Sequence, residues 1–352
     1  METDIGKDIV TAGMVKDLRL DGDNISIEIQ LASQESPLQD QLREQIEAAL
    51  RHAGQQLGEG VGAVEVHFTA DTRSANERVR EESTPLPNVR KIIAVGAGKG
   101  GVGKSTVSAN LALALQMSGA KVGLMDADIY GPSMPRMMGI TGQPVSNDGK
   151  NLEAMENYGL KVMSIGFLVE DDTPMIWRGP MVQSALEQMM RDVNWGELDV
   201  LVVDMPPGTG DAQLTMSQKV PLTGAVIVST PQDIALLDAR KGLNMFRKVD
   251  VPVFGIVENM SYFTCPRCNE RSEIFAHGGA RLEAERLGCE FLGEIPLAID
   301  IRTTSDGGSP IVVSQPDSEH AKAYRAISDQ VADKIDQTLA LQETEAPRIV
   351  IQ

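Results

Sequence analysis

One nine-residue segment constrains the fold of this chain more than any other. It reads Gly98-Lys99-Gly100-Gly101-Val102-Gly103-Lys104-Ser105-Thr106 and fits the pattern G-x-x-x-x-G-K-[ST]. The apolar run Lys91–Val95 before it is typical of a short buried strand, and the Ala- and Leu-rich run Val107–Met117 after it predicts a helix. In such a strand–loop–helix unit, loop amides and the positive end of the helix dipole bind phosphate. We therefore expect a phosphate-binding loop (P-loop) with all nine residues at a bound nucleotide.

The pattern after this loop predicts the fold class. Apolar strands alternate with helices, which is typical of parallel βαβ units, and the strands are Val-, Ile- and Leu-rich without alternation, as in strands buried on both faces. The expected fold is α/β, a mostly parallel sheet sandwiched by helices. Strands are expected at Lys91–Val95, Lys121–Asp126, Leu160–Ile165, Leu198–Asp204, Gly224–Ser229, Val253–Glu258 and Glu290–Ile295, and helices at Val107–Met117, Met181–Val193, Ile234–Lys248, Gly279–Leu287 and Ser318–Leu341.

The chain before the loop predicts a separate small α/β domain. Polar and apolar residues alternate at Asn24–Leu31 and Val61–Phe68, as in half-buried strands, while Leu38–Leu50 carries a helical apolar stripe. Ile9–Leu18 is expected to be a helix or turn, and the polar, proline-containing stretch before Lys91 is expected to be a linker. The predicted division is a small domain at 1–70, a linker at 71–90, a P-loop domain at 91–341 and a tail at 342–352.

Composition excludes several functional classes. The net charge of −18 argues against a nucleic-acid surface, and no apolar run is long enough for a transmembrane helix, so we expect neither nucleic acid nor membrane as a partner. The N-terminus lacks the pattern of a secretory signal. Three cysteines are too few for a disulfide framework, which favours a reducing, cytoplasmic location.

Three carboxylates follow expected strands, at the sheet edge where open α/β folds bind ligands. Lys104 is expected at the nucleotide phosphates as a catalytic cation, with Ser105 as a Mg²⁺ ligand. Asp204 is expected to hold the magnesium shell, Asp126 to support Mg²⁺ indirectly, and Asp128 to orient the attacking water.

Lys99 is an unusual residue for such a loop. It follows the first glycine and is poorly aimed at its own nucleotide. A cation reaching into a facing subunit would stabilise charge at the transferring phosphate, as an arginine finger does, so we expect a catalytic role across a dimer. On this residue alone, an ordinary exposed lysine is the simpler interpretation.

Cys265-Pro266-Arg267-Cys268 is the second chemical signal. A single C-x-x-C is ambiguous between a redox dithiol, half of a zinc site and half of a cluster site. Zinc and 4Fe–4S sites commonly take four ligands, so a two-fold dimer could complete either one. Cys289 is expected to be a small buried side chain, and His277 a plain surface or turn histidine.

The P-loop segment resembles the deviant Walker A motif of the SIMIBI ATPases, the class that includes MinD, ParA and the nitrogenase iron protein. Within that class, 89–324 is similar to the Mrp/ApbC-type iron–sulfur cluster carriers. The matching strings are Asp126-Ala127-Asp128-Ile129-Tyr130-Gly131-Pro132-Ser133, Trp177-Arg178-Gly179-Pro180-Met181, Asp204-Met205-Pro206-Pro207-Gly208-Thr209-Gly210-Asp211, Ser229-Thr230-Pro231-Gln232-Asp233, Val257-Glu258-Asn259-Met260-Ser261 and the C-x-x-C.

This resemblance implies a homodimer in which Lys99 acts across the interface and Asn259 contacts the adenine of ATP. It also implies that Cys265 and Cys268 of two subunits bridge one labile 4Fe–4S cluster. Residues 1–68 resemble a small domain of iron–sulfur assembly factors, through Asp8–Leu18. One departure is Asn269, where the family usually has glycine.

The function that we expect is an ATPase that delivers an iron–sulfur cluster to apoproteins and meets cluster assembly factors, with ATP, Mg²⁺ and the bridging cluster bound. A positioning ATPase of the MinD or ParA type is one alternative. It is disfavoured because residues 342–352 form no basic amphipathic helix and the acidic balance opposes DNA binding. A dimeric zinc-site scaffold with weak ATPase activity is the other.

Overall fold

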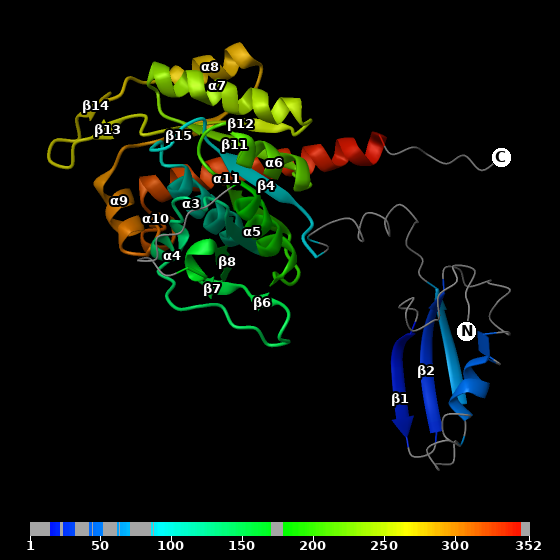
Figure 1. Cartoon of the computed structure of the whole chain (residues 1–352). Helices are drawn as coiled ribbons and strands as arrows, with labels where there is room; N and C mark the ends of the chain where they lie inside the picture. Colours follow the sequence, from blue (N-terminus) through cyan, green and yellow to red (C-terminus); the bar gives the residue numbers. More distant parts are fainter. Residues whose placement is uncertain are drawn as a thin grey trace. The chain divides into compact units, whose positions relative to one another are not determined.

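The computed structural model describes residues 15–21, 24–31, 42–43, 45–51, 62, 64–70, 86, 88–169 and 179–345. The chain divides into two compact units, Met1–Ser83 and Thr84–Gln352 (Figure 1). Each unit has its own apolar core, so each is described by itself.

The first unit contains a three-stranded sheet in the order β1-β2-β3. Strand β2 (Asn24–Leu31) pairs antiparallel with β1 (Val15–Asp21) and parallel with β3 (Val64–Ala70). Residues 45–51 are helical, and the core is built from Ile27, Ile29, Leu42, Ile46 and Val66.

The prediction of a helix or turn over Ile9–Leu18 is wrong for its described part, because Val15 to Leu18 lie in β1. Leucines alternate with charged residues from Asp17 to Asp21, a strand pattern that a segment ending at Leu18 cuts short. Pairing with β2 supplies the hydrogen bonds that decide the outcome.

The second unit is built on an eight-stranded sheet in the order β15-β12-β11-β4-β10-β5-β8-β7. Only the edge strand β7 runs antiparallel to its neighbour; the other described pairings are parallel. The strands are β4 (Ile92–Gly96), β5 (Val122–Asp126), β7 (Met155–Asn157), β8 (Leu160–Ser164), β10 (Val200–Asp204), β11 (Gly224–Ser229), β12 (Val253–Asn259) and β15 (Phe291–Ile295).

Helices cover both faces of this sheet. One face carries α3 (Lys104–Met117) and α11 (Glu319–Glu345), with the shorter α4 (Met134–Met137), α9 (Ile299–Asp306) and α10 (Ile311–Ser314) beside them. The other face carries α7 (Asp233–Lys248) and α8 (Gly279–Leu287), continued by α6 (Asp211–Lys219) and α5 (Gly179–Arg191), as Figure 1 shows for α7 and α8.

The predicted fold class is confirmed. All residues of β4, β5, β10 and β11 are buried, as their unbroken apolar runs require of strands covered on both faces. The expected strands and long helices are present, with ends shifted by a few residues. Sequence reasoning missed the edge strand β7, the short helices α4, α6, α9 and α10, and the two-residue strands β6 (Leu152–Glu153), β9 (Val193–Asn194), β13 (Phe263–Thr264) and β14 (Arg271–Ser272).

Two expected boundaries differ from the structure. Most of the predicted linker lies outside the described residues, but Leu86 is buried in the core of the second unit and Val89 bridges to Leu198. At the other end, α11 continues to Glu345, past the expected start of the tail, and 346–352 lie outside the described residues. In the part of the chain that the structure describes, no helix is long and apolar enough to cross a membrane.

Candidate functional site

The P-loop connects the end of β4 to the first turn of α3, where Lys104 is the first helical residue. Gly101 and Gly103 adopt left-handed φ angles of 80° and 81°, which side-chain-bearing residues rarely tolerate. A Cβ at Gly98 would collide with the backbone carbonyl of Asp238 in α7. The glycines therefore serve different purposes: two turn the backbone, and one lets the loop pack directly on a helix.

Lys104 lies among carboxylates. Its Nζ is 2.8 Å from Asp204 Oδ2 and 3.8 Å from Asp128 Oδ2, and its side chain is 5% exposed. Burying an ammonium requires such partners, because desolvation costs more than one weak ion pair returns. The lysine head group is thus held at the mouth of the P-loop, where an incoming phosphate would compete with the carboxylates for it.

Asp204 ends β10 and is fully buried. Its Oδ2 accepts a hydrogen bond of 2.6 Å from the hydroxyl of Ser105, and its Oδ1 accepts one of 2.6 Å from Ser108. A hydroxyl and a carboxylate side by side, beside a phosphate-binding loop, are the oxygen ligands that Mg²⁺ prefers. The structure brings together Lys104, Ser105 and Asp204, as the sequence predicted.

Asp126 ends β5 and holds the following loop in place. Its Oδ2 accepts hydrogen bonds from the amides of Ser133 and Met134 and from the Ser164 hydroxyl at 3.0–3.1 Å. Burial, with the charge of Asp204 adding to it, raises the pKa of Asp126 to about 7. The Asp126 carboxylate therefore anchors the loop that carries Asp128.

Asp128 faces the same site from that loop. Burial raises the pKa of this carboxylate, and its Oδ1 is buried without a hydrogen-bond partner among the described residues. An orphaned buried oxygen fits a group meant to hold a ligand or a water molecule. The loop after Asp204 reaches the P-loop as well, because the Gly208 amide donates to the Ala97 carbonyl at 3.0 Å.

Asn259, the last residue of β12, also contacts the P-loop. Its amide Nδ2 donates to the Val102 carbonyl at 2.8 Å, and it lies so close to Gly103 that a Cβ there would collide with it. The next residue, Met260, has a left-handed φ of 57° and places its Cε near the same glycine. In this structure Asn259 therefore braces the loop, and its contact with adenine stays a prediction.

Lys99 is half-buried, and its side chain has no ion pair or hydrogen bond with any described residue. A P-loop amine without a partner among the residues that the structure describes agrees with a role across a dimer, which stays a prediction.

The two cysteines lie in a short hairpin that projects from the body of the unit (Figure 1). Strand β13 pairs antiparallel with β14, and Cys265 to Glu270 form the connecting turn. The turn is closed by two backbone hydrogen bonds, Cys265 to Glu270 and Asn269 to Cys265. Asn269 adopts a left-handed φ of 58°; asparagine tolerates this conformation better than most residues, which explains how it replaces the usual glycine.

The two thiols differ from the third cysteine. Backbone N–H groups of Arg267 and Cys268 point at the Cys265 sulfur and lower the pKa of its thiol, while Cys268 is exposed. Such amides favour a thiolate, which is the metal-binding form. Cys289 is half-buried against the main core, where burial raises the pKa of its thiol.

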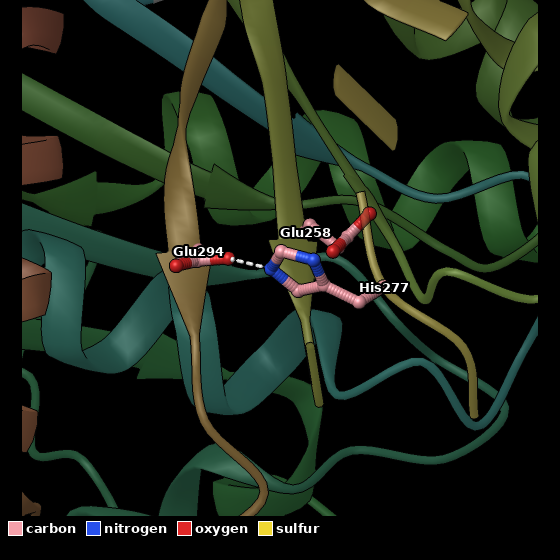
Figure 2. A group of neighbouring side chains, drawn as sticks. All are labelled: Glu258, His277 and Glu294. Atoms are coloured by element: carbon pink, nitrogen blue, oxygen red, sulfur yellow. Dashed lines mark hydrogen bonds and ion pairs between the residues drawn. The ribbon is translucent and has the colours of Figure 1, made fainter. Parts of the chain in front are cut away.

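His277 is exposed and lies in a bend, as predicted for a surface or turn histidine, but it also belongs to a hydrogen-bond network that the sequence did not predict. Its Nε2 lies 2.6 Å from Glu294 Oε2, as Figure 2 shows, and 2.7 Å from Arg271 Nη2. Ser261 Oγ lies within 3.0 Å of both Glu258 and Glu294 and joins the two carboxylates. Burial alone would raise the pKa of Glu294, but hydrogen bonds from His277 and Ser261 outweigh it, and the pKa is lowered.

Glu258, His277 and Glu294 offer ligand atoms within 4.8 Å of one another, a spacing that suits a metal ion. Two observations oppose a metal here. Both Glu258 oxygens already accept backbone N–H bonds, from Gly278 and Ala280, and His277 Nε2 already lies 2.7 Å from the Arg271 guanidinium. The cluster is therefore an ion-pair and hydrogen-bond network that joins the cysteine hairpin to the sheet.

Sequence reasoning missed Ser108, Ser164 and Glu258 as site residues. Ser108 had a usable signal, since it lies three residues after Ser105 and therefore on the same face of α3. Ser164 and Glu258 had none that a single sequence reveals, because their partners are distant in the chain. Trp177 and Arg178, part of the family resemblance, lie outside the described residues.

Comparisons with known proteins agree with this arrangement. Residues 2–66 match a family described as an iron–sulfur cluster assembly protein. The chain is 54% identical over 71% of its length to a protein from Escherichia coli K12 named iron–sulfur cluster carrier protein, covering 68% of it. It is 46% identical over 95% of its length to a Synechocystis protein of the same name, covering 94% of it.

Solved structures show the same fold. A nucleotide-binding protein from Archaeoglobus fulgidus, solved in complex with ADP, aligns with a TM-score of 0.59 at 38% identity, over 72% of this chain and 98% of that one. The cell division ATPase MinD from Pyrococcus furiosus aligns with a TM-score of 0.52 at 21% identity, over 69% and 98%. Residues 88–332, which hold the P-loop and the cysteine hairpin, match the family description, and the chain belongs to the NUBPL iron-transfer P-loop NTPases.

Proposed function

We propose that this protein is a homodimeric ATPase that carries an iron–sulfur cluster and delivers it to apoproteins. The observation that carries this proposal is the pair of Cys265 and Cys268 at the tip of a projecting hairpin, in the same unit as the P-loop. A 4Fe–4S cluster commonly takes four thiolates, so two copies of the hairpin would complete one site across a two-fold axis. The relatives named iron–sulfur cluster carrier proteins support this choice of cargo.

The P-loop residues would bind ATP, and the geometry of the loop supports a role for each of them. Lys104 would turn from Asp204 toward the phosphates, leaving Asp204 and Ser105 free to ligate Mg²⁺. Asp128 would orient the attacking water through its unpartnered oxygen, held in place by Asp126. Asn259 would contact adenine, and Lys99 would reach the nucleotide of the second subunit.

The rest of the proposal concerns partners. The first unit matches an iron–sulfur cluster assembly family, which supports docking to assembly factors or recipient apoproteins. The three free cysteines fit a reducing compartment such as the cytoplasm.

Anaerobic reconstitution with iron and sulfide tests the cargo. We expect about four irons per dimer, since that is the content of one bridging cluster. Cys265→Ala and Cys268→Ala should lose the iron, whereas the matched control Cys289→Ala should retain it, because Cys289 lies outside the hairpin. Unchanged iron in Cys265→Ala would sink the proposal. Zinc at one per dimer without iron would favour the zinc scaffold instead.

A second experiment tests delivery. The loaded dimer is mixed with an apoprotein that requires a 4Fe–4S cluster, and recovery of its activity is followed with and without Mg-ATP. Recovery that is no faster than with free iron and sulfide would contradict the carrier function. Sedimentation with liposomes and with DNA tests the positioning alternative, for which the likeness to MinD shows only the fold.

A further inference from the structure

A short segment connects the nucleotide site to the cysteine hairpin. Asn259 lies on the P-loop at one end, and Cys265 begins the turn of the hairpin at the other, with only five residues between them. The two sites of this unit are therefore consecutive along one stretch of chain.

The first part of the segment is tied to the P-loop. Asn259 donates to the Val102 carbonyl, and Met260 packs its side chain near Gly103. A phosphate in the loop would bind backbone N–H groups, and the Val102 carbonyl and Gly103 that Asn259 and Met260 contact belong to the same loop backbone. Met260 is also held in a left-handed conformation that is unfavourable for a methionine. Backbone strain of this kind persists only where the surroundings impose it, and it is common at switching segments.

The second part of the segment is tied to the sheet edge. The Ser261 amide donates to the Ile295 carbonyl at 3.0 Å, and the Tyr262 carbonyl accepts from Leu297 at 2.7 Å. Residues 261–262 therefore move together with the end of β15.

Besides the pairing of β13 with β14, the side chain of Arg271 in β14 contacts this segment. The Arg271 guanidinium stacks on the Tyr262 ring, with its Cζ 3.7 Å from the ring centroid, and contacts His277 and Glu294 at its other side. His277 Nε2 can donate to Glu294 or accept from Arg271, but it cannot do both at once. The network thus has two hydrogen-bond arrangements rather than one.

We propose that Asn259–Cys265 is a coupling segment, with Met260 as its hinge and Arg271 as the positioning residue that makes the cysteine hairpin follow it. Nucleotide binding at the P-loop then changes the geometry and accessibility of Cys265 and Cys268. This inference rests on the proposed nucleotide binding but not on the identity of the cargo. Thermodynamic linkage makes this coupling reciprocal. If nucleotide changes the affinity of the cysteines for a ligand by some factor, that ligand changes the affinity for nucleotide by the same factor.

The test measures thiol alkylation in the full-length, cluster-free protein. Rates for Cys265, Cys268 and Cys289 are read from their separate peptides by mass spectrometry, with and without a saturating non-hydrolysable ATP analogue and Mg²⁺. We expect the Cys265 rate to change by about fivefold or more, the low end of typical coupling between sites. Cys289 serves as the internal control and should change little.

In Arg271→Ala, the nucleotide should change the Cys265 alkylation rate by less than about twofold. The nucleotide affinity of this variant, measured by calorimetry, should match that of the unmodified protein. The matched control is Arg281→Ala, which also removes a guanidinium from an aromatic ring, that of Phe291, but lies outside the network. It should keep the full effect. Should Arg271→Ala fail to fold, Met260→Gly tests the hinge independently, since glycine accepts the left-handed conformation without strain.

Several results would overturn the inference. One is an unchanged Cys265 alkylation rate in protein that has bound nucleotide. Another is a rate change in Arg271→Ala or Met260→Gly as large as in the unmodified protein, which would indicate that dimer closure shields the thiols. Absence of nucleotide binding would defeat both this inference and the proposed ATPase. Normal nucleotide binding with an unchanged rate would leave the carrier function standing, because the reconstitution experiment tests it separately.

Discussion

Lys104, Asp128 and Asp204 at the P-loop are buried, whereas at the cysteine hairpin every residue from Pro266 to Arg271 is exposed. Lys104 pairs with Asp204, which also accepts hydrogen bonds from two serines, so most of that site is organised before any ligand arrives. The hairpin turn is closed by two backbone hydrogen bonds and two strand residues on each side.

This difference matches the proposed tasks. A site that stabilises charge on a reacting phosphate benefits from fixed dipoles in a water-excluded place. A site that must take up cargo and release it benefits from open access and low local stability. The predictions below either break this contrast or sharpen it.

The largest effect is expected at Lys104. Lys104→Met keeps the bulk of the side chain but removes the charge at the phosphates, so ATP hydrolysis should fall by about 10²–10³-fold, as when one charge-stabilising group is removed. Phosphate release under saturating ATP measures this. Lys121→Met removes an exposed lysine paired with Glu197 and should hydrolyse ATP at the unmodified rate. A Lys104→Met protein of full activity would show that this cation is not catalytic.

Gly98→Ala should come next. Its Cβ would press on the backbone of α7, which cannot move aside as a flexible side chain can. We expect a loss of about 1–3 kcal/mol in the free energy of unfolding, typical of overpacking, together with weaker nucleotide binding. Denaturant titration of the full-length protein measures the free energy of unfolding. Gly131→Ala, where a Cβ meets open space, is the matched control and should change little. Equal stability of the two variants would contradict the close packing of this loop.

A smaller, severalfold difference is expected between thiols of the cluster-free protein. Neighbouring amides lower the pKa of Cys265, whereas burial raises the pKa of Cys289. Near pH 7 a larger fraction of Cys265 is therefore thiolate, and only the thiolate reacts. Iodoacetamide should modify Cys265 first, with the gap narrowing as pH rises and both thiols ionise. Faster modification of Cys289 at pH 7 would show that the hairpin amides do not favour the thiolate.

The smallest effect concerns stability. Cys268→Ala removes an exposed side chain from the hairpin tip, and the free energy of unfolding of the cluster-free protein should stay within about 0.5 kcal/mol. The same substitution is expected to abolish cluster binding. Thermal denaturation without metal gives the first result. A large loss of stability there would mean that the cysteine supports the fold itself, and the contrast between the two regions would weaken.

The P-loop site could be predicted from the sequence because its signals are local. Glycines, a lysine and a serine at fixed spacing require a strand before them and a helix after them, and the acids at strand ends then converge on one sheet edge. The roles of Lys99, Asp128 and Asn259 remain predictions.

The hairpin half was less accessible for a physical reason. The C-x-x-C marks a metal or redox site, but its anchoring depends on Arg271, His277, Glu258 and Glu294, which four different segments contribute. Nothing in the local pattern of His277 distinguishes a surface histidine from one in a network. Similarly, β1 forms because β2 offers a pairing edge, which local propensity does not reveal.

The short stretch from Asn259 to Cys265 also sets a geometric ceiling. Six residue steps of extended chain span at most about 22 Å. In every conformation that the protein adopts, the α-carbons of the two residues therefore stay within that length. Any cargo bound to the cysteines is therefore tethered to the nucleotide site within that distance. Delivery over a longer range requires movement of the whole subunit.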